Sequence, residues 1–339
     1  MIKEAISKVI EKKDLTKEEA ALTMDEIMSG NATDAQIAAF ITALRLKGET
    51  VDEITGFTKI MREKATHLKA QGKVIDTCGT GGDGAHTFNI STIAAFIAAG
   101  AGATVAKHGN RSVSSSCGSA DCLQALGINI MAPVEEVQKC LNEVGIGFLF
   151  APLLHASMKY AIGPRREIGI RTVFNILGPM TNPANAKAQL IGVYAKALTE
   201  TMAWVLKNLG SHHVMVVHGL DGLDEISSTG PTQVTELKDG KVKTYQVSPQ
   251  DFGFSRAKAD DLKGADAGEN ARLCEAILSG EKGPKRDICL LNAGAAIYVA
   301  DLAGNLAEGI AKAKESIDSG AAMAKLETMR RFLPAEEKH

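Results

Sequence analysis

One stretch, residues 74–119, constrains the fold of this 339-residue chain more than any other. Val74–Cys78 is a short apolar run that ends in glycines, and Ala103–Ala106 is a second strand-like run. Between them, Ile90–Ala101 is apolar, rich in alanine and long enough for a helix. The pattern predicts a βαβ unit, in which the crossover makes the two strands parallel neighbours.

Each predicted strand is followed by a polar loop, residues 79–88 and 107–119. Both loops therefore lie at carboxyl ends of strands, where open α/β sheets bind ligands, and we expect them to face one pocket. No Asp or Glu occurs between Gly84 and Ala120, whereas Lys107 and Arg111 supply positive charge. Glycines let backbone N–H groups approach oxygen atoms, and a helix amino end attracts anions. The pattern favours a phosphate or diphosphate site over a simple tight turn.

Two common phosphate motifs do not match this loop. Gly79, Gly81 and Gly84 satisfy G-x-G-x-x-G, but a dinucleotide site also has an acid about twenty residues later. No acid follows here before Asp121. A Walker loop has Lys and then Ser or Thr after the last glycine, whereas Ala85 stands in that place. The sequence therefore excludes both motifs.

Six motifs, spread in order over nearly the whole chain, instead resemble those of the anthranilate phosphoribosyltransferase family of the tryptophan pathway. No motif position departs from the family pattern. The motifs are Gly79-Thr80-Gly81-Gly82-Asp83, Asn89-Ile90-Ser91-Thr92, Lys107-His108-Gly109-Asn110-Arg111 with Ser114 and Ser115, Gly163-Pro164-Arg165-Arg166, Arg171-Thr172-Val173-Phe174-Asn175-Ile176-Leu177-Gly178-Pro179, and Asp221-Gly222-Leu223-Asp224-Glu225.

The composition is that of a soluble globular protein. Apolar residues make up 45% of the chain, which is enough for a large core. Because 38 basic residues balance 40 acidic ones, we expect no nucleic-acid partner and no membrane surface. Six cysteines in neither zinc-type pairs nor a dense disulfide pattern, and no signal-peptide or membrane-spanning run, favour a cytoplasmic protein.

We expect an α/β fold with a small all-helical N-terminal domain and a larger α/β domain, whose mainly parallel central sheet is flanked by helices. Residues 1–71 show helical spacing throughout, with a Thr16-x-x-Glu19 capping box. The larger domain takes residues 72–163 and 188–339. The resemblance implies that about residues 164–187 return to the helical domain, and that this domain forms a homodimer; packing within one chain is the alternative.

The rest of the larger domain alternates between the two kinds of element. The pattern predicts helices from Ala120 and Pro133, strands Ile128–Met131 and Ile146–Phe150, a helix break at Gly163-Pro164, strand Gln189–Tyr194, helix Thr199–Leu209, strand His213–His218, a hairpin over Thr232–Val247 turning at Asp239-Gly240, and mostly helix over Ala265–Phe332.

The resemblance implies an enzyme that joins anthranilate to 5-phosphoribosyl 1-diphosphate (PRPP) and releases diphosphate. Such an enzyme must bind the leaving diphosphate and neutralise its charge, and it must stabilise positive charge at the ribosyl C1. It must also orient the amine toward that carbon. The implied PRPP-binding residues are Gly79, Gly82, Asp83, Thr87, Asn89, Ile90, Ser91, Thr92, Lys107, His108, Gly109, Asn110, Arg111, Ser112, Val113, Ser114, Ser115 and Ser119.

A departing diphosphate carries several negative charges, so we expect a Mg²⁺ cofactor with oxygen ligands. Asp224 and Glu225 are adjacent acids in a glycine-containing loop after a predicted strand. Alone, such a pair is typical of a solvated surface loop. With the resemblance, we assign Asp224, Glu225 and Ser91 as the magnesium ligands.

For anthranilate, the resemblance points to Gly79, His108, Asn110 and Arg165, with the Pro152–His155 turn as a wall. Arg165 follows Gly163-Pro164 at the predicted start of a helix, and its guanidinium matches carboxylate geometry. The alternative is a solvated helix-end arginine. His108 is a candidate acceptor for the proton of the amine, but the reaction requires no strong base and no residue is assigned firmly as catalytic.

Three other functions compete with this one. A pyrimidine nucleoside phosphorylase shares the implied architecture, but its glycine loop lacks the Gly79–Asp83 form. A non-catalytic homologue that binds nucleic acid is expected to have a basic surface and to have lost the acidic pair. Asp224 and Glu225 are present here. A helical oligomerisation scaffold does not explain the two polar loops, residues 79–88 and 107–119, or the lack of acids between Gly84 and Ala120.

Overall fold

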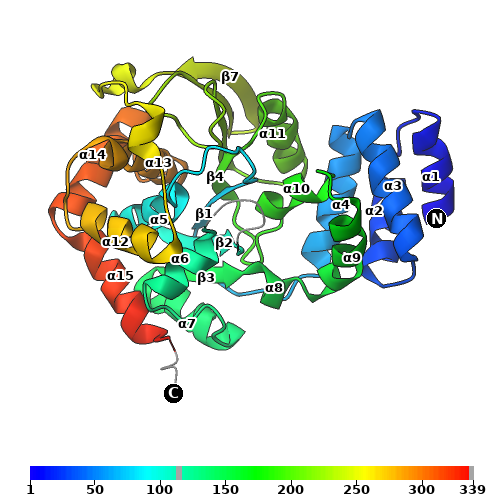
Figure 1. Cartoon of the computed structure of the whole chain (residues 1–339), viewed down its shortest axis with the longest axis horizontal. Coiled ribbons are helices and arrows are strands. Elements are labelled where there is room, and N and C mark those ends of the chain that lie inside the picture. Colours follow the sequence, from blue (N-terminus) through cyan, green and yellow to red (C-terminus); the bar gives the residue numbers. More distant parts are fainter. Residues whose placement is uncertain (112–116, 336–339) are drawn as a thin grey trace.

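A single seven-stranded sheet organises the computed structural model, which describes residues 1–111 and 117–335. Its strand order is β3-β2-β1-β4-β5-β6-β7 (Figure 1). The strands are β1 (Val74–Gly79), β2 (Thr104–Gly109), β3 (Ile146–Phe150), β4 (Ala188–Gly192), β5 (His213–Gly219), β6 (Thr232–Lys238) and β7 (Lys241–Val247).

The chain reverses its direction of travel across the sheet between β3 and β4. Strands β1, β2 and β3 are laid down toward one edge, and β4 then returns to the free side of β1. All pairs from β3 to β5 are parallel, while β6 and β7 add an antiparallel hairpin. Because parallel crossovers are right-handed, this reversal sends the β4–β5 helix to the opposite face and opens a crevice between the carboxyl ends of β1 and β4.

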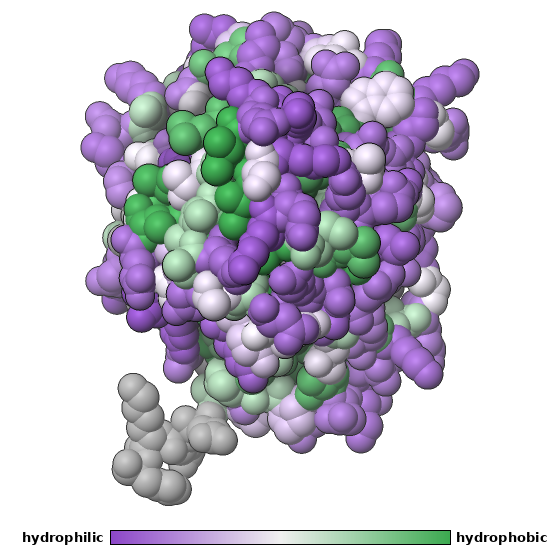
Figure 2. Space-filling view, turned by 90° about the vertical axis from the view of Figure 1, so that its right-hand side faces the viewer, coloured by the Kyte–Doolittle hydropathy of each residue, from purple (hydrophilic) through white to green (hydrophobic). Residues whose placement is uncertain are grey.

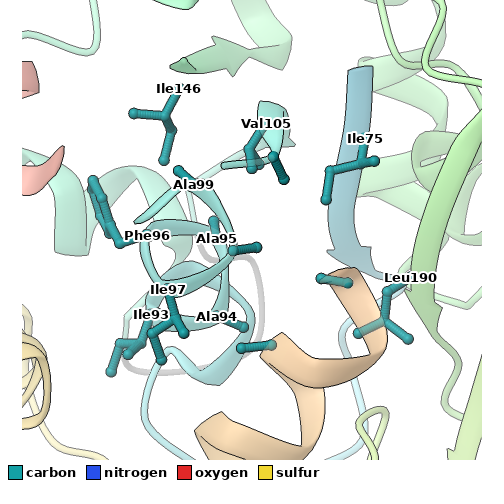
Figure 3. Close-up of a cluster of buried hydrophobic side chains, with 14 of the residues drawn as sticks. Ile75, Ile93, Ala94, Ala95, Phe96, Ile97, Ala99, Val105, Ile146 and Leu190 are labelled. Atoms are coloured by element: carbon teal, nitrogen blue, oxygen red, sulfur yellow. The ribbon is translucent and has the colours of Figure 1, made fainter. Parts of the chain in front are cut away.

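One face of the sheet is covered by α5 (Ile90–Gly100), with α13 (Pro284–Val299), α14 (Leu306–Asp318) and α15 (Ala321–Phe332) packed around it. Figure 3 shows α5 with Ala95 and Ala99 on the side of Val105, whereas Phe96 lies on the opposite side of the helix. Helix α5 is buried over almost its whole length because it is apolar on every side. Its alanines favour the helix and let α13 approach closely.

The opposite face is covered by α11 (Leu198–Asn208), against which α4 (Val51–Glu63) packs. Helix α4 belongs to a bundle with α1 (Ile2–Ile10), α2 (Lys17–Met28) and α3 (Asp34–Lys47), seen on the right of Figure 1. Capping boxes at Thr16, Thr33 and Thr50 start three of these helices, as the Thr16-x-x-Glu19 pattern predicts for α2. One apolar core joins the bundle to this side of the sheet.

The remaining helices connect these layers. They are α6 (Ser119–Ala125), α7 (Val134–Val144), α8 (Ala151–Leu154), α9 (Lys159–Ile168), α10 (Phe174–Leu177) and α12 (Ala267–Leu278), with 3₁₀ turns at Ala156–Met158, Gly178–Met180, Pro249–Phe252 and Ala259–Leu262. Helix α9 packs on α2 and α3, which agrees with a return of the chain to the helical bundle. The domain boundaries themselves stay a prediction. In the described ranges, every helix is too short or too polar to cross a bilayer.

The predicted fold class is confirmed, and three local predictions are wrong. Ile128–Met131 is not a strand: Ile128 makes one bridge to Pro334, because this short run bonds the ends of α6 and α15 instead. Strand β2 extends to Gly109 rather than stopping at Ala106, because Lys107–Gly109 pair with β3. Gly163-Pro164 does not break α9, since a proline in its middle removes only one helical hydrogen bond and the buried ring is accommodated.

A polar network fixes the far end of the sheet. His213 is buried, with Nδ1 2.8 Å from Asp301 Oδ1 and Nε2 3.2 Å from Glu236 Oε1. The hydroxyls of Tyr245 and Tyr298 also donate to Glu236, at 3.0 and 2.8 Å. Burial raises the pKa of Glu236, but these hydrogen bonds outweigh it and bring the pKa below its ordinary value of 4.5. His213 is therefore structural, as expected for a histidine beside a strand.

Glu236→Gln tests a pH-dependent contribution of this network to stability. Because the folded pKa lies below the unfolded one, the stabilisation is present above pH 4.5 and is lost as the pH falls through the folded value. At neutral pH we expect the variant to lose about 2 kcal/mol in urea unfolding. The difference in unfolding free energy between the variant and wild type should shrink below about pH 4. Exposed Glu143→Gln is the control, and a difference for Glu236→Gln that is constant with pH contradicts the account.

Candidate active site

Two glycines bring three segments together at the crevice between β1 and β4. Gly79, the last residue of β1, pairs with Gly192 at the end of β4. Asp224, in the loop after β5, packs on both: a Cβ on Gly192 would lie 1.5 Å from the Asp224 carbonyl oxygen, and one on Gly79 2.7 Å from Asp224 Oδ2. Only residues without a side chain permit this approach.

The glycine loop after β1 is tied to that junction. Gly81 N–H donates to Asp224 Oδ2 at 2.8 Å, and Thr80 N–H donates to the Gly192 carbonyl at 2.9 Å. Gly81, Gly82 and Gly84 have φ angles of 64°, 76° and 75°, which are left-handed conformations that favour glycine. The loop is thus held at Thr80 and Gly81 in a shape that glycines make possible.

The amino end of α5 faces the same crevice. Its N-cap Asn89 does not cap the helix but donates to the Cys117 carbonyl and accepts from Asn270. Ser91 N–H already donates to the Glu225 carboxylate, so these N–H groups are less open to a ligand than the sequence predicts. Thr92 Oγ1 is buried without a hydrogen-bond partner in the described residues. A buried orphan hydroxyl at a positive helix end fits an anionic ligand.

Lys107 is a buried cation beneath this helix end. Its Nζ donates to the Thr77 carbonyl at 2.5 Å and to Ser91 Oγ at 3.2 Å. Burial lowers the pKa of Lys107, and the negative charge of Asp76 opposes that shift. The side chain comes from strand β2 rather than from the following loop, so its position is rigid.

Three carboxyl groups, those of Asp83, Asp224 and Glu225, lie close together beside the glycine loop. Burial and then the charge of Asp83 raise the pKa of Asp224 to about 7. Burial and then the charge of Asp224 raise the pKa of Glu225 well above its ordinary value. Crowded carboxylates of this kind are stabilised by a cation.

These groups fit Mg²⁺. Across residues 1–111 and 117–335, no three His, Cys, Asp or Glu side chains are already arranged as a metal site. Mg²⁺, however, is usually held by one or two carboxylates, waters and substrate phosphates rather than by a complete protein cage. Asp224 and Glu225 supply such a pair, and Ser91 lies beside Glu225.

His108 lies on the other face of the sheet from Lys107, because side chains alternate along β2. Its ring is 5.1 Å from that of His155, and Nε2 of each is buried without a partner in the described part of the chain. Burial, and then the charge of His155, lower the pKa of His108 to about 3. His108 is therefore neutral at physiological pH, with one ring nitrogen open.

The other predicted residues of the second loop are held by neighbours. Arg111 donates to Asp121 at 2.6 Å and to Gln124 at 2.9 Å, so its charge is matched within α6. Ser119 Oγ donates to the Asn110 carbonyl, and a Cβ on Gly109 would lie 2.3 Å from Ser119 Oγ. Predicted residues Ser112, Val113, Ser114 and Ser115 lie outside the described residues.

Two further predicted residues have separate positions. Thr87 forms an isolated bridge with Lys263 at the end of the glycine loop. Arg165 lies in the last turn of α9, not at the start of a helix as predicted. Its half-buried guanidinium is 5.1 Å from the Phe174 ring centroid, burial lowers its pKa, and within the described ranges no carboxylate pairs with it. A shielded arginine without an acidic partner fits an anionic ligand.

Sequence reasoning missed several residues that shape the site. Asp76 is fully buried and accepts from His108 N–H at 3.0 Å and from Asn182 Nδ2 at 2.8 Å. Its signal is an acid inside an apolar strand, where a carboxylate needs partners. Arg171 donates to the Gly82 carbonyl and stacks 4.5 Å from the Tyr194 ring centroid. Nothing in the sequence places Arg171 beside a loop 89 residues away.

Comparison with known proteins defines the class first. A model described as "Glycosyl transferase family, helical bundle domain" matches residues 3–65, and one described as "Glycosyl transferase family, a/b domain" matches residues 71–323. The chain is thus a glycosyltransferase built from a helical bundle and an α/β domain. It belongs to the anthranilate phosphoribosyltransferase family, as the following relatives show.

The chain is 59% identical over 330 residues to the anthranilate phosphoribosyltransferase of Moorella thermoacetica, covering 97% of each protein. Its fold is similar to that of the Thermus thermophilus enzyme, with a TM-score of 0.92, 42% identity, and 97% and 99% of the two chains covered. The Saccharomyces cerevisiae enzyme in complex with PRPP and Mg gives a TM-score of 0.89 at 29% identity, covering 98% and 97%. The resemblance found in the sequence is confirmed, and the competing functions lose their support.

Gly192→Ala tests the close approach at the crevice. Its Cβ would overlap the Asp224 backbone, which cannot swing aside as a flexible side chain can. We expect a loss of about 1–3 kcal/mol in unfolding free energy, together with displacement of the Asp224 loop. Gly268→Ala in the first turn of α12, where the nearest atom is 3.4 Å from the new Cβ, is the control. Equal stabilities of the two variants would contradict this role of Gly192.

Proposed function

We propose that this enzyme transfers the 5-phosphoribosyl group from PRPP to the amine of anthranilate. The products are N-(5-phosphoribosyl)anthranilate and diphosphate, in L-tryptophan biosynthesis. One observation carries the proposal: Asp224 and Glu225 meet the glycine loop and the amino end of α5 at the crevice between β1 and β4. The yeast relative, which has been solved with PRPP and Mg, supports this assignment.

The donor half of the reaction belongs to this crevice. The glycine loop and the amino end of α5 bind the phosphate groups, with Lys107 as a fixed positive charge below them. Asn89, Ser91 and Thr92 add polar groups around the same helix end. Preorganised positive groups stabilise the charge that develops on the leaving diphosphate, and a rigid strand and helix cost no reorganisation.

Asp224, Glu225 and Ser91 would hold Mg²⁺, as their crowding and raised pKa values indicate. When bound, the ion neutralises part of the charge of the diphosphate. Asp83 contributes further negative charge beside Asp224. Without a bound cation, burial and crowding favour the protonated forms of Asp224 and Glu225, and the diphosphate lacks this counter-ion.

The acceptor half belongs to the other face of β2 and to α9. Arg165 pairs with the anthranilate carboxylate, because its guanidinium is shielded and has no acid partner in the described ranges. His108, Asn110 and Gly79 orient the amine. A ribosylated arylamine that carries the positive charge is strongly acidic, so neutral His108, whose pKa is about 3, suffices as the proton acceptor. The yeast relative has also been solved with 4-fluoroanthranilate.

A cytoplasmic homodimer is part of the proposal. All six cysteines are buried thiols, which agrees with a reducing compartment. The helical-bundle face carries scattered apolar surface (Figure 2), and its helices expose Ile10, Leu22, Leu46 and Ile162. Such a face is suited to a second copy of the chain. We place the helical domain at residues 1–71 with about 164–187, and the α/β domain at 72–163 and 188–339.

The reaction is tested by mixing purified protein with anthranilate and PRPP and following anthranilate fluorescence. We expect the fluorescence to fall only when Mg²⁺ is present, with one diphosphate released per anthranilate consumed. Excess chelator should stop the reaction, because the charge of the leaving diphosphate then lacks its metal counter-ion. No fluorescence loss in the presence of Mg²⁺, despite measurable PRPP binding, would refute the proposed activity.

Arg165→Ala tests the acceptor site. Removal of a charge-assisted carboxylate contact should raise the KM for anthranilate by about tenfold to a hundredfold, while the KM for PRPP stays within about twofold. Steady-state kinetics with each substrate varied in turn measures both values. Arg166→Ala, an exposed neighbour in the same turn, is the control. Equal increases in both KM values would mean that Arg165 is not the carboxylate partner.

A further inference from the structure

Arg171 holds the glycine loop from a segment outside the sheet. It lies between α9 and α10, and it donates from Nη2 to the Gly82 carbonyl. Its guanidinium also stacks on Tyr194, 4.5 Å from the ring centroid. Tyr194 in turn donates its backbone N–H to Thr80 Oγ1 at 3.1 Å. The stacked pair of Arg171 and Tyr194 therefore holds the loop at two points, Gly82 and Thr80.

The loop needs such a support because its own chain is weakly restrained. Gly81, Gly82 and Gly84 are free to adopt many conformations, and each must take a left-handed one here. Gly81 is anchored by Asp224 and Thr80 by Gly192, but the next carbonyl, that of Gly82, is held by Arg171. A planar guanidinium can donate and stack at the same time, which an ammonium group cannot do as well.

The same short segment carries the acceptor-side arginine. Arg165 lies six residues before Arg171, at the end of α9, and its guanidinium packs on Phe174, the first residue of α10. Arg165 lies in α9, just before the connection Gly169–Val173, and Arg171 lies within that connection. Arg165 packs on Phe174, whereas Arg171 contacts Gly82 and Tyr194. Only five residues separate the two arginines along the chain, so the anchor on Gly82 and the Arg165 side chain are joined through one short stretch of backbone.

We propose that Arg171 is a positioning residue that fixes the glycine loop in its donor-binding shape and couples that shape to Arg165. The kinetic part of this inference rests on the proposed transfer from PRPP to anthranilate. The structural part does not, because the hydrogen bond and the stacking involve only residues of the chain. The two parts therefore have separate tests.

The structural part is tested by hydrogen exchange of the peptide that covers residues 79–88, in substrate-free protein. Arg171→Ala should raise its amide exchange rates by about tenfold, since a loop with fewer anchors opens more often. Arg171→Lys should give an intermediate rate, because lysine keeps the positive charge but lacks the planar guanidinium that donates and stacks at once. Arg166→Ala, whose side chain is exposed, should match wild type. Unchanged exchange in Arg171→Ala overturns the proposal.

The kinetic part is tested with the same variants. Arg171→Ala should raise the KM for PRPP by about tenfold, with partial rescue in Arg171→Lys. It should also reduce the degree to which bound PRPP tightens anthranilate binding, measured by calorimetry with and without the donor. A higher KM for anthranilate alone, or a lower thermal midpoint with both KM values unchanged, means a different or purely structural role. An inactive wild type would instead refute the proposed function and leave the exchange result standing.

Discussion

The contact of Asp224 with Gly79 and Gly192 is the constraint on which the site depends. A β1 strand and a β4 strand run side by side only because the chain reverses across the sheet, and their last residues then form a paired floor. Because Gly79 and Gly192 have no side chains, the loop after β5 can approach their backbone closely. One carboxylate can then accept a hydrogen bond from the glycine loop and lie next to Glu225.

This geometry separates the charges of the site. Lys107 lies at the amino end of α5, whereas Asp83, Asp224 and Glu225 lie together beside the glycine loop. Burial disfavours the charged form of Asp224 and the nearby charge of Asp83 adds to this effect, so the pKa of Asp224 rises to about 7. Under the proposed assignment, a cation and an anionic substrate that bind together would balance these charges.

Alternation along β2 sends neighbouring side chains to different faces of the sheet. Lys107 faces α5, and His108, the next residue, faces His155; in the proposed function these are the donor side and the acceptor side. Arg165 at the end of α9 and Arg171 in the following connection are close in sequence, and they contact Phe174 and Gly82 respectively.

The sequence by itself determined the βαβ unit, the hairpin at Asp239-Gly240 and the anionic character of the ligand, because these depend on local periodicity, turn residues and charge. It also carried the family motifs. It did not determine that β2 continues through Lys107, that α9 runs through Pro164, or that Ile128–Met131 forms no strand. Those outcomes depend on pairing with β3 and on packing between helices. Only the tertiary structure decided that Asp76 supports His108 and that Arg171 reaches Gly82, because such contacts join segments far apart in the chain.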